Sequence, residues 1–156
     1  MESTNYENNP KSIKYHVKQY LIKNKKRIEK KIVVDLPAGN GITSKIIKDL
    51  GGIPIAYDLF PEYFKIEGIT CERANVLDKI PLDSNTVDFV LCQEGIEHFS
   101  DQFKALQEFN RILKPNGSLI ITTPNYSNLR ARLSYFLSES ERFNSIMPPM
   151  KLIRYG

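Results

Sequence analysis

Residues 31–41 read KIVVDLPAGNG, an apolar run that ends in an acid and continues into a loop with two glycines. The β-branched residues at 32–34, without polar alternation, predict a buried parallel strand covered on both faces. Pro37 ends this strand, and Gly39 and Gly41 allow a turn without Cβ atoms before a helix that begins near Ile42. The stretch predicts a loop where a ligand lies against the backbone, although any tight strand-to-helix turn also favours glycine.

A second acid strengthens the ligand interpretation. The apolar run Ile53–Tyr57 predicts the next strand, and Asp58 stands at its end, 19 residues after Gly39. In a doubly wound sheet, the acid at the tip of the second strand lies beside the first and can accept both hydroxyls of a ribose. The loop and the acid together predict a ligand that contains a nucleoside.

Asp35 helps to choose between two cofactor classes. A dinucleotide brings its pyrophosphate to the helix N-terminus, where an adjacent carboxylate repels it, and Ser44 stands where the third glycine of a dinucleotide site is expected. S-adenosylmethionine (SAM) has no phosphate and carries a sulfonium and an ammonium, so acids around the loop attract it. The acid favours SAM over a dinucleotide.

The acid followed by a small residue and G-x-G resembles motif I of the class I SAM-dependent methyltransferases, with Pro37 where a first glycine often stands. Residues 81–99, PLDSNTVDFVLCQEGIEHF, resemble the small-molecule methyltransferases of the quinone-biosynthesis type. The R-I-L-K-P-N-G run at 111–117 and the T-P-N run at 123–125 match the same family in register. The resemblance covers roughly residues 30–125.

The resemblance implies SAM as the cofactor and a small-molecule acceptor as the substrate. Asn75 stands where family members commonly have an acid near the adenine, and Gln93 and Glu94 are candidates for the methionine half. The cofactor contacts that we expect on this basis are Asp35, Pro37, Ala38, Gly39, Gly41, Asp58, Leu59, Asn75, Val76, Gln93 and Glu94.

Methyl transfer needs alignment more than a catalytic side chain, but some acceptors must lose a proton. His98 is the candidate base, because it is an imidazole that follows the fourth expected strand near the methyl donor. An alternative role for His98 is to order the loop at a helix start. His16 lies in the N-terminal helix and is expected at the surface or in a lid.

The pattern predicts an α/β, Rossmann-like three-layer sandwich with a mainly parallel sheet of order 3-2-1-4-5. A polar, unstructured stretch of nine residues precedes a helix that Pro10 opens. The amphipathic helix expected from Asp101 to Leu113 presents Phe103, Leu106, Phe109, Ile112 and Leu113 on one face. The remaining expected elements are strands at 32–35, 53–57, 69–73, 87–92 and 118–123, helices at 42–50 and 129–137, and a helical turn at 60–64.

Family members normally add two strands after the fifth, and residues 126–156 lack two β-rich runs. We therefore expect strands 6 and 7 to be absent or truncated, which leaves the edge of strand 5 to be covered. The cover would be the segment after Leu129, a homodimer partner or the missing part of a longer protein. A longer parent is favoured, because the last residues do not become more polar.

Charge divides the chain into an N-terminal basic helical segment (1–30), a SAM-binding core (31–125) and a C-terminal helical or irregular extension (126–156). Residues 1–31 carry nine Lys or Arg against three Glu, whereas residues 32–125 carry eight against thirteen acids. A basic flank suits nucleic acid or an acidic membrane, but no aromatic-interleaved patch accompanies it, so a solvated helix face is the simpler interpretation.

The remaining composition indicates a soluble protein. No apolar run is long enough to cross a bilayer, and the polar N-terminus has no signal-peptide pattern, so the expected location is cytoplasmic. Cys71 and Cys92 fall on the third and fourth strands, too far apart for a disulfide, and no metal-ligand spacing occurs.

These observations predict a SAM-dependent methyltransferase that transfers a methyl group to a small acceptor by O- or C-methylation. One alternative is an NAD(P)-linked oxidoreductase domain, which Asp35, Ser44 and the later motifs disfavour. Another is a non-catalytic SAM-binding remnant.

Overall fold

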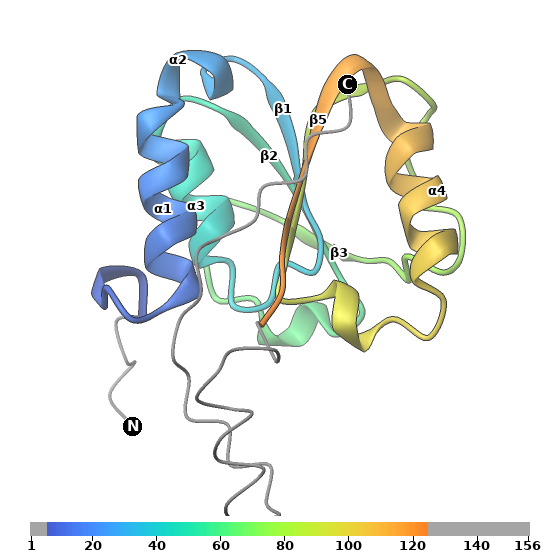
Figure 1. The fold of residues 1–156 in the computed structure, drawn as a ribbon, viewed down its shortest axis with the longest axis horizontal. Helices are drawn as coiled ribbons and strands as arrows, with labels where there is room; N and C mark the ends of the chain where they lie inside the picture. Colours follow the sequence, from blue (N-terminus) through green and yellow to red (C-terminus); the bar gives the residue numbers. More distant parts are fainter. Residues whose placement is uncertain (1–5, 125–156) are drawn as a thin grey trace, which may run out of the picture.

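A computed structural model describes residues 6–124 of the chain (Figure 1). The chain begins with a 3-10 turn, η1, and two consecutive helices, and then alternates strands with helices or turns. In order the elements are η1 (Tyr6–Asn8), α1 (Ile13–Lys23), α2 (Lys25–Ile28), β1 (Ile32–Asp35), α3 (Ile42–Asp49), β2 (Ile53–Asp58), η2 (Pro61–Tyr63), β3 (Cys71–Arg73), β4 (Val87–Gln93), η3 (Ile96–His98), α4 (Gln102–Ile112) and β5 (Leu113–Thr122).

The five strands form one parallel sheet of order β3-β2-β1-β4-β5, which confirms the predicted topology. The order reverses direction between β1 and β4, so the crevice at their carboxyl ends is the switch point where open α/β sheets bind ligands. Cys71 on β3 and Cys92 on β4 are separated by β2 and β1, and both are free thiols, as expected.

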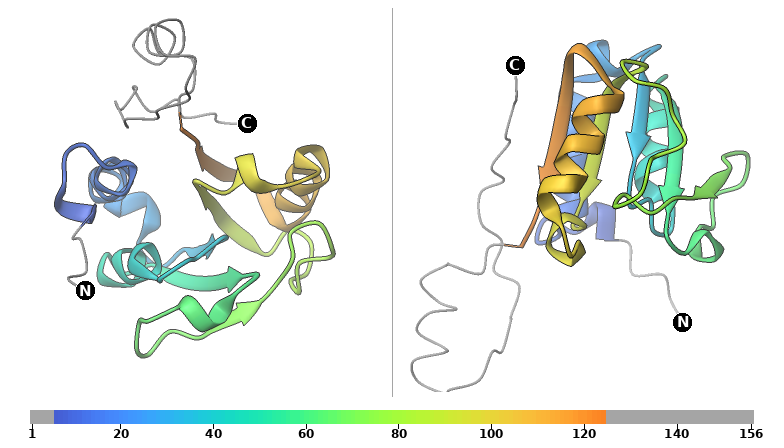
Figure 2. Two further views of the ribbon diagram at one scale, coloured as in Figure 1. Left: turned by 90° about the horizontal axis from the view of Figure 1, so that it is seen from below. Right: turned by 90° about the vertical axis from the view of Figure 1, so that its right-hand side faces the viewer.

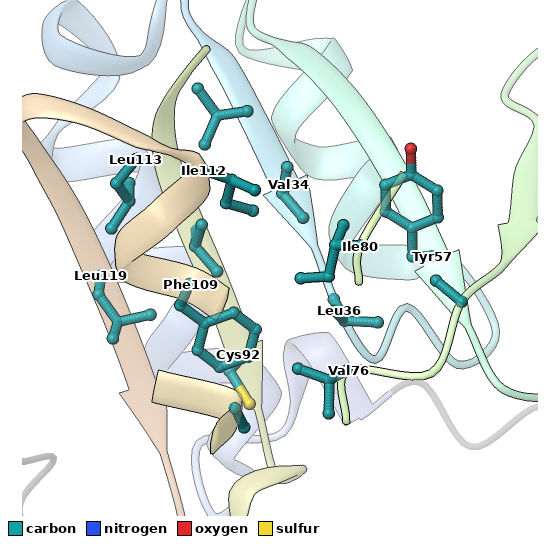
Figure 3. Packing of buried hydrophobic residues seen from close by; sticks show 14 residues of the cluster. Val34, Leu36, Tyr57, Val76, Ile80, Cys92, Phe109, Ile112, Leu113 and Leu119 are labelled. Atoms are coloured by element: carbon teal, nitrogen blue, oxygen red, sulfur yellow. The ribbon is translucent and has the colours of Figure 1, made fainter. Parts of the chain in front are cut away.

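Helices cover both faces of the sheet: α1 and α3 lie on one face and α4 lies on the other (Figure 2). Because successive strand side chains point to opposite faces, the apolar residues divide into two clusters. On the α4 face, Val34, Val90 and Leu119 pack with Phe109 and Ile112 (Figure 3). The second cluster, on the opposite face, joins Val17 and Leu21 of α1 to Ile47 of α3 and to Val33, Phe89, Leu91 and Ile120 of the sheet.

Several element boundaries differ from the sequence prediction. α1 begins at Ile13 rather than at Pro10, because Ser12 is the N-cap and its hydroxyl accepts a hydrogen bond from the Lys14 N–H at 3.2 Å. Part of the stretch expected to be unstructured, Tyr6–Asn8, forms η1. β3 is shorter than predicted, and β4 extends by one residue to Gln93.

The end of α4 and the start of β5 also correct the prediction. β5 begins at Leu113, before the expected turn, because Leu113 pairs with Val87 and the ladder resumes at Ser118 opposite Phe89. Residues 114–117 form an irregularity inside the strand. Phe103 was predicted on the apolar face of α4, but it is 71% exposed, whereas Phe109 and Ile112 are fully buried.

Within residues 6–124, β5 is an outer strand, paired only with β4. The expected covers of its free edge, including the predicted helix at 129–137, lie outside the described residues. Among the described helices, none has both the length and the apolar character to span a bilayer.

Candidate ligand site

A cavity of about 220 Å³ opens at the carboxyl ends of β1 and β4. Its walls come from the first turn of α1, the loop after β1, the first turn of α3 and the exit of β4. The lining residues are Lys14, Asp35, Pro37, Ala38, Gly39, Asn40, Thr43, Gln93 and Glu94. The cavity therefore lies at the switch point, where the sequence predicted a ligand.

Strand alternation explains why polar residues gather here. Val33 faces α1 and α3, so Asp35, two residues further on, points to the same face. By the same alternation, Gln93 points to the same face as Leu91, which lies two residues earlier on β4. All the buried polar residues in the described part lie on this face or on α3: Asp35, Thr43, Ser44, Asp58, Gln93 and Thr122.

Asp35 is a buried acid with a specific partner. It is 1% exposed, and the Ser44 hydroxyl donates a hydrogen bond to its Oδ2 at 2.6 Å. Burial raises the pKa of Asp35 to about 7, against the lowering effect of hydrogen bonds from the Ser44 hydroxyl and N–H. Ser44, at the position of a dinucleotide motif's third glycine, thus holds the acid at the cavity wall.

Gln93 presents an unsatisfied donor. The Thr43 hydroxyl donates to Gln93 Oε1 at 3.0 Å, which fixes the amide, while Gln93 Nε2 is buried without a hydrogen-bond partner. A buried amide donor without a partner costs free energy, so a ligand acceptor at this position would be stabilising.

Glu94 is held in an uncommon backbone conformation, with a φ of 48°. Its N–H donates to the carbonyl oxygen of Thr122 at 2.9 Å and to the hydroxyl of that residue at 3.2 Å. Gly95 follows against Pro37, where an added Cβ would lie 2.4 Å from the Pro37 Cδ. Burial raises the pKa of Glu94, Lys14 and His98 lower it, and Glu97 raises it.

The two loop glycines have different surroundings. Gly39 has a φ of +53° and open space where a Cβ would stand, so it leaves the cavity wall bare. Gly41 has a φ of +85°, but a Cβ there would lie 2.5 Å from the Phe64 ring. Gly41 does not line the cavity. Its role as a cofactor contact stays a prediction, while the missing side chain of Gly41 leaves room for the Phe64 ring.

Asp58 connects β2 to the glycine loop. The Gly39 N–H donates to its Oδ2 at 2.8 Å and the Phe60 N–H donates to its Oδ1 at 2.9 Å, and the side chain is 8% exposed. The acid is thus more deeply embedded than a free strand tip. It supports the loop, and each oxygen keeps a lone pair for a ligand hydroxyl.

The remaining predicted residues lie outside the cavity lining. Leu59 is 45% exposed beside Asp58, whereas Val76 is buried in the α4-face cluster. Asn75 is exposed, and its side-chain oxygen accepts the Leu77 N–H at 3.0 Å. His98 is exposed at the end of η3 and does not line the cavity. In residues 6–124, no group of three or more candidate side chains could hold a metal ion.

Sequence reasoning missed three lining residues: Lys14, Asn40 and Thr43. A signal for Lys14 exists, because it lies three residues before Val17 and seven before Leu21, on the helix face that packs on the sheet. Thr43 follows from its place in the first turn of α3. Neither Lys14 nor Thr43 belongs to the pattern of glycines and acids from which the site was predicted.

The parallel sheet and the acidic cavity at its switch point define a Rossmann-like domain suited to a nucleoside ligand with cationic groups. Residues 34–121 match the family described as "Methyltransferase domain". The chain therefore belongs to the class I SAM-dependent methyltransferases, as the motifs indicated.

Relatives of this chain support the same family. The human mitochondrial ubiquinone biosynthesis O-methyltransferase is 32% identical over 130 residues, which cover 74% of this chain and 34% of that protein. An uncharacterised methyltransferase-like protein of Schizosaccharomyces pombe is 37% identical over 97 residues, which cover 58% of this chain and 37% of that protein. This chain thus spans less than half the length of these relatives.

A SAM-dependent methyltransferase structure from Archaeoglobus fulgidus has the same fold, with a TM-score of 0.65 at 18% identity. The match covers 86% of this chain and 63% of that one.

The residues present fit SAM. The cavity, at about 220 Å³, is below the roughly 300–1,000 Å³ typical of whole-ligand pockets, so it accommodates one end of such a molecule. Asp35 and Glu94 suit an ammonium or sulfonium, and the unpartnered Gln93 Nε2 suits an acceptor atom. Asp58 lies just beyond the bare backbone of Gly39, where a ribose would follow.

Proposed function

We propose that this chain binds SAM and transfers its methyl group to a small-molecule acceptor by O- or C-methylation. The observation that carries the proposal is the pair of carboxylates, Asp35 and Glu94, in the cavity at the switch point. Both favour a cationic ligand, and neither would tolerate a pyrophosphate nearby.

In the proposed complex, Asp58 accepts the ribose hydroxyls, Gly39 gives the ligand access to the backbone, and Leu59 and Asn75 lie towards the adenine. Val76 supports that end from the core. Asp35, Gln93 and Glu94 hold the methionine half. The domain division at 31–125 and a cytoplasmic location remain part of this proposal.

When bound, SAM supplies a methyl group that its sulfonium already activates. The chain's contribution is then mainly alignment, which can lower a barrier by roughly 7–11 kcal/mol. Pro37 and Gly95 approach each other closely where the glycine loop meets the exit of β4, so these two walls of the cavity are in contact. His98 remains a hypothesis for the base, since its charge reaches Glu94 although it does not line the cavity.

Calorimetric titration with SAM, S-adenosylhomocysteine and NADH tests the cofactor. We expect binding of the first two and none of NADH. Tight binding of NADH alone would overturn the proposal in favour of an oxidoreductase domain.

A second experiment separates an enzyme from a non-catalytic SAM-binding protein. The protein is incubated with a metabolite pool and with SAM that carries a labelled methyl group. Label in a small molecule is the expected result. Binding without any transfer, in the protein extended to the length of its relatives, would support the non-catalytic alternative.

A further inference from the structure

We propose that the end of the domain opposite the cavity docks on an anionic lipid surface. This end carries a basic patch, which consists of Lys23, Lys25, Lys26, Arg27, Lys30, Lys31 and Lys114. The inference goes beyond the proposed function, because none of these residues lines the cavity. It concerns the surface on which the protein is held and not the reaction.

The fold gathers the basic patch at one end of the molecule. The parallel strands all begin at this end, where α2 lies, and the cavity lies where β1 and β4 end (Figure 1). Asp88 links the members from distant parts of the sequence: its Oδ1 lies 3.5 Å from Lys31 Nζ, and Lys114 Nζ donates to its Oδ2 at 3.0 Å. The start of β5 therefore contributes to the same surface as α2.

Acids neutralise little of the basic patch. Within residues 6–124, its ion pairs within 4.0 Å are those of Lys31 and Lys114, and both use the single carboxylate of Asp88. Residues 23–31 include one acid, Glu29. Four further members are exposed and form no ion pair in this part of the chain: Lys23, Lys25, Lys26 and Lys30. The patch thus keeps most of its positive charge.

The turn after α2 holds Lys30 in an uncommon backbone conformation. The Lys31 N–H donates to the Ile28 carbonyl oxygen at 2.9 Å, Glu29 has a φ of −54° and a ψ of 129°, and Lys30 has a φ of 59°. These are angles of a type II turn, in which glycine is favoured at the position of Lys30. A lysine here incurs a backbone cost, and such costs are found at functional positions.

Two exposed apolar side chains accompany the charges. Ile53, the first residue of β2, is 52% exposed, and its N–H donates to the Lys31 carbonyl oxygen at 2.8 Å. Ile22 is 45% exposed in the last turn of α1, next to Lys23. At a lipid surface, the ammonium groups meet phosphates while the apolar side chains enter the acyl boundary. This combination favours a lipid surface.

The aromatic residues argue against a single-stranded nucleic acid as the partner. Bases of single strands stack on exposed aromatic side chains. Among the described residues, the exposed aromatic side chains are Phe60, Tyr63 and Phe103. They follow β2 or stand in the first turn of α4, at the cavity end of the sheet. The basic patch therefore has no stacking surface beside it.

Docking through the basic patch leaves the cavity facing away from the lipid. The cofactor and a water-soluble acceptor can then reach the cavity from solution. We therefore expect the affinity for SAM to be the same with and without vesicles.

The test is co-sedimentation of the full chain with vesicles of phosphatidylcholine, either alone or mixed with phosphatidylglycerol. We expect binding to the mixed vesicles alone, and its loss in about 1 M salt, where the Debye length is about 3 Å. Each basic residue near an anionic surface strengthens binding by about fivefold, so Lys25→Gln combined with Lys26→Gln should weaken it by roughly 25-fold.

A matched double variant controls for net charge. Lys11→Gln combined with Lys104→Gln removes two exposed lysines from the cavity end and should leave vesicle binding unchanged. Lys30→Gly should weaken binding by about fivefold without lowering the melting temperature, because glycine suits the turn. Thermal melting of each variant checks the fold.

The apolar side chains separate a lipid surface from other polyanions. Ile22→Gln combined with Ile53→Thr should weaken binding to the mixed vesicles, whereas any binding to duplex DNA should not change. Unchanged vesicle binding by this variant would overturn the lipid assignment.

Equal weakening by the two lysine double variants would also overturn the inference, since net charge alone would then explain the binding. Binding to duplex DNA without binding to mixed vesicles would assign the basic patch to nucleic acid instead. Binding to neither would make it a solvated helix face. SAM binding is measured separately, so the proposed function stands or fails independently of these outcomes.

Discussion

The two faces of the sheet are built from the same strands, yet they differ at the carboxyl end. On the α4 face, Val34 is followed by Leu36, and Val90 is followed by Cys92, so the apolar cluster continues to the end of β1 and β4. On the α1 and α3 face, Val33 is followed by Asp35, and Leu91 by Gln93. Two residues that are neighbours along a strand thus belong to different environments, one to the apolar core and the other to the cavity wall.

The contrast explains how one short domain can be stable and still hold a polar site. The α4 face is covered by a large cluster of buried apolar residues, and their packing stabilises the sheet. The opposite face accepts buried polar groups, each of which needs a hydrogen-bond partner or a ligand. We expect substitutions on the α4 face to affect stability, and those on the opposite face to affect ligand binding first.

The largest expected effect is on the α4 face. Phe109 is fully buried among residues of β1, β4 and β5 (Figure 3). Phe109→Ala should lower the free energy of unfolding by about 3–5 kcal/mol, because it leaves a large cavity. Denaturant unfolding measures the loss. Exposed Phe103 on the same helix is the matched control, and Phe103→Ala should change stability by less than about 0.5 kcal/mol.

Asp35→Asn tests the opposite face, where the buried carboxylate of Asp35 should destabilise the protein without a ligand. The pKa of Asp35 is raised from 3.8 to about 7, so between these values the folded state keeps a proton that the unfolded state has lost. Stability from this group therefore falls as pH rises from about 4 to about 7 and stays low above that.

The Asn variant cannot lose that proton, so it should be more stable than the wild type at pH 8 by roughly 2–4 kcal/mol, and about equal near pH 4. It should also bind SAM more weakly at pH 8, because the ligand's cation loses a carboxylate. Thermal unfolding across this pH range gives the comparison. A difference that does not vary with pH would mean that Asp35 has no shifted titration.

Sequence patterns predicted much of this division. The strand positions and the sheet order follow from the apolar runs and their spacing, and Asp35 and Asp58 follow from their places at strand ends. The surroundings of Gly41 did not follow, because its contact with Phe64 joins residues 23 positions apart that no local period links. Lys14 was missed for the same reason, since helix α1 meets the cavity only through tertiary packing.

The two loop glycines sharpen the comparison within a single turn. Both have a positive φ, so valine at either position incurs a similar backbone cost of about 1–2 kcal/mol. Gly41→Val should destabilise by roughly 1–3 kcal/mol more, because the side chain collides with Phe64 and Ile66. Gly39→Val should fold and fail to bind SAM, since its side chain fills the cavity. Equal stability of the two variants would contradict this assignment.

Asp58 gives the smallest change in stability, and it tests whether the cavity face serves the ligand at its ribose end as well. Asp58→Ala removes the acceptor of the Gly39 and Phe60 N–H groups, so it should lower stability by about 1–2 kcal/mol. The affinity for SAM should fall by about 1.5–3 kcal/mol if the carboxylate also accepts ribose hydroxyls.

Asp58→Asn separates these two effects. It keeps one oxygen for the Gly39 N–H and should recover most of the stability, but a neutral amide replaces the carboxylate at the ribose. Titration should then show weak SAM binding by a stable protein. If the Asn variant binds SAM as tightly as the wild type, Asp58 only supports the loop, and the ribose lies elsewhere.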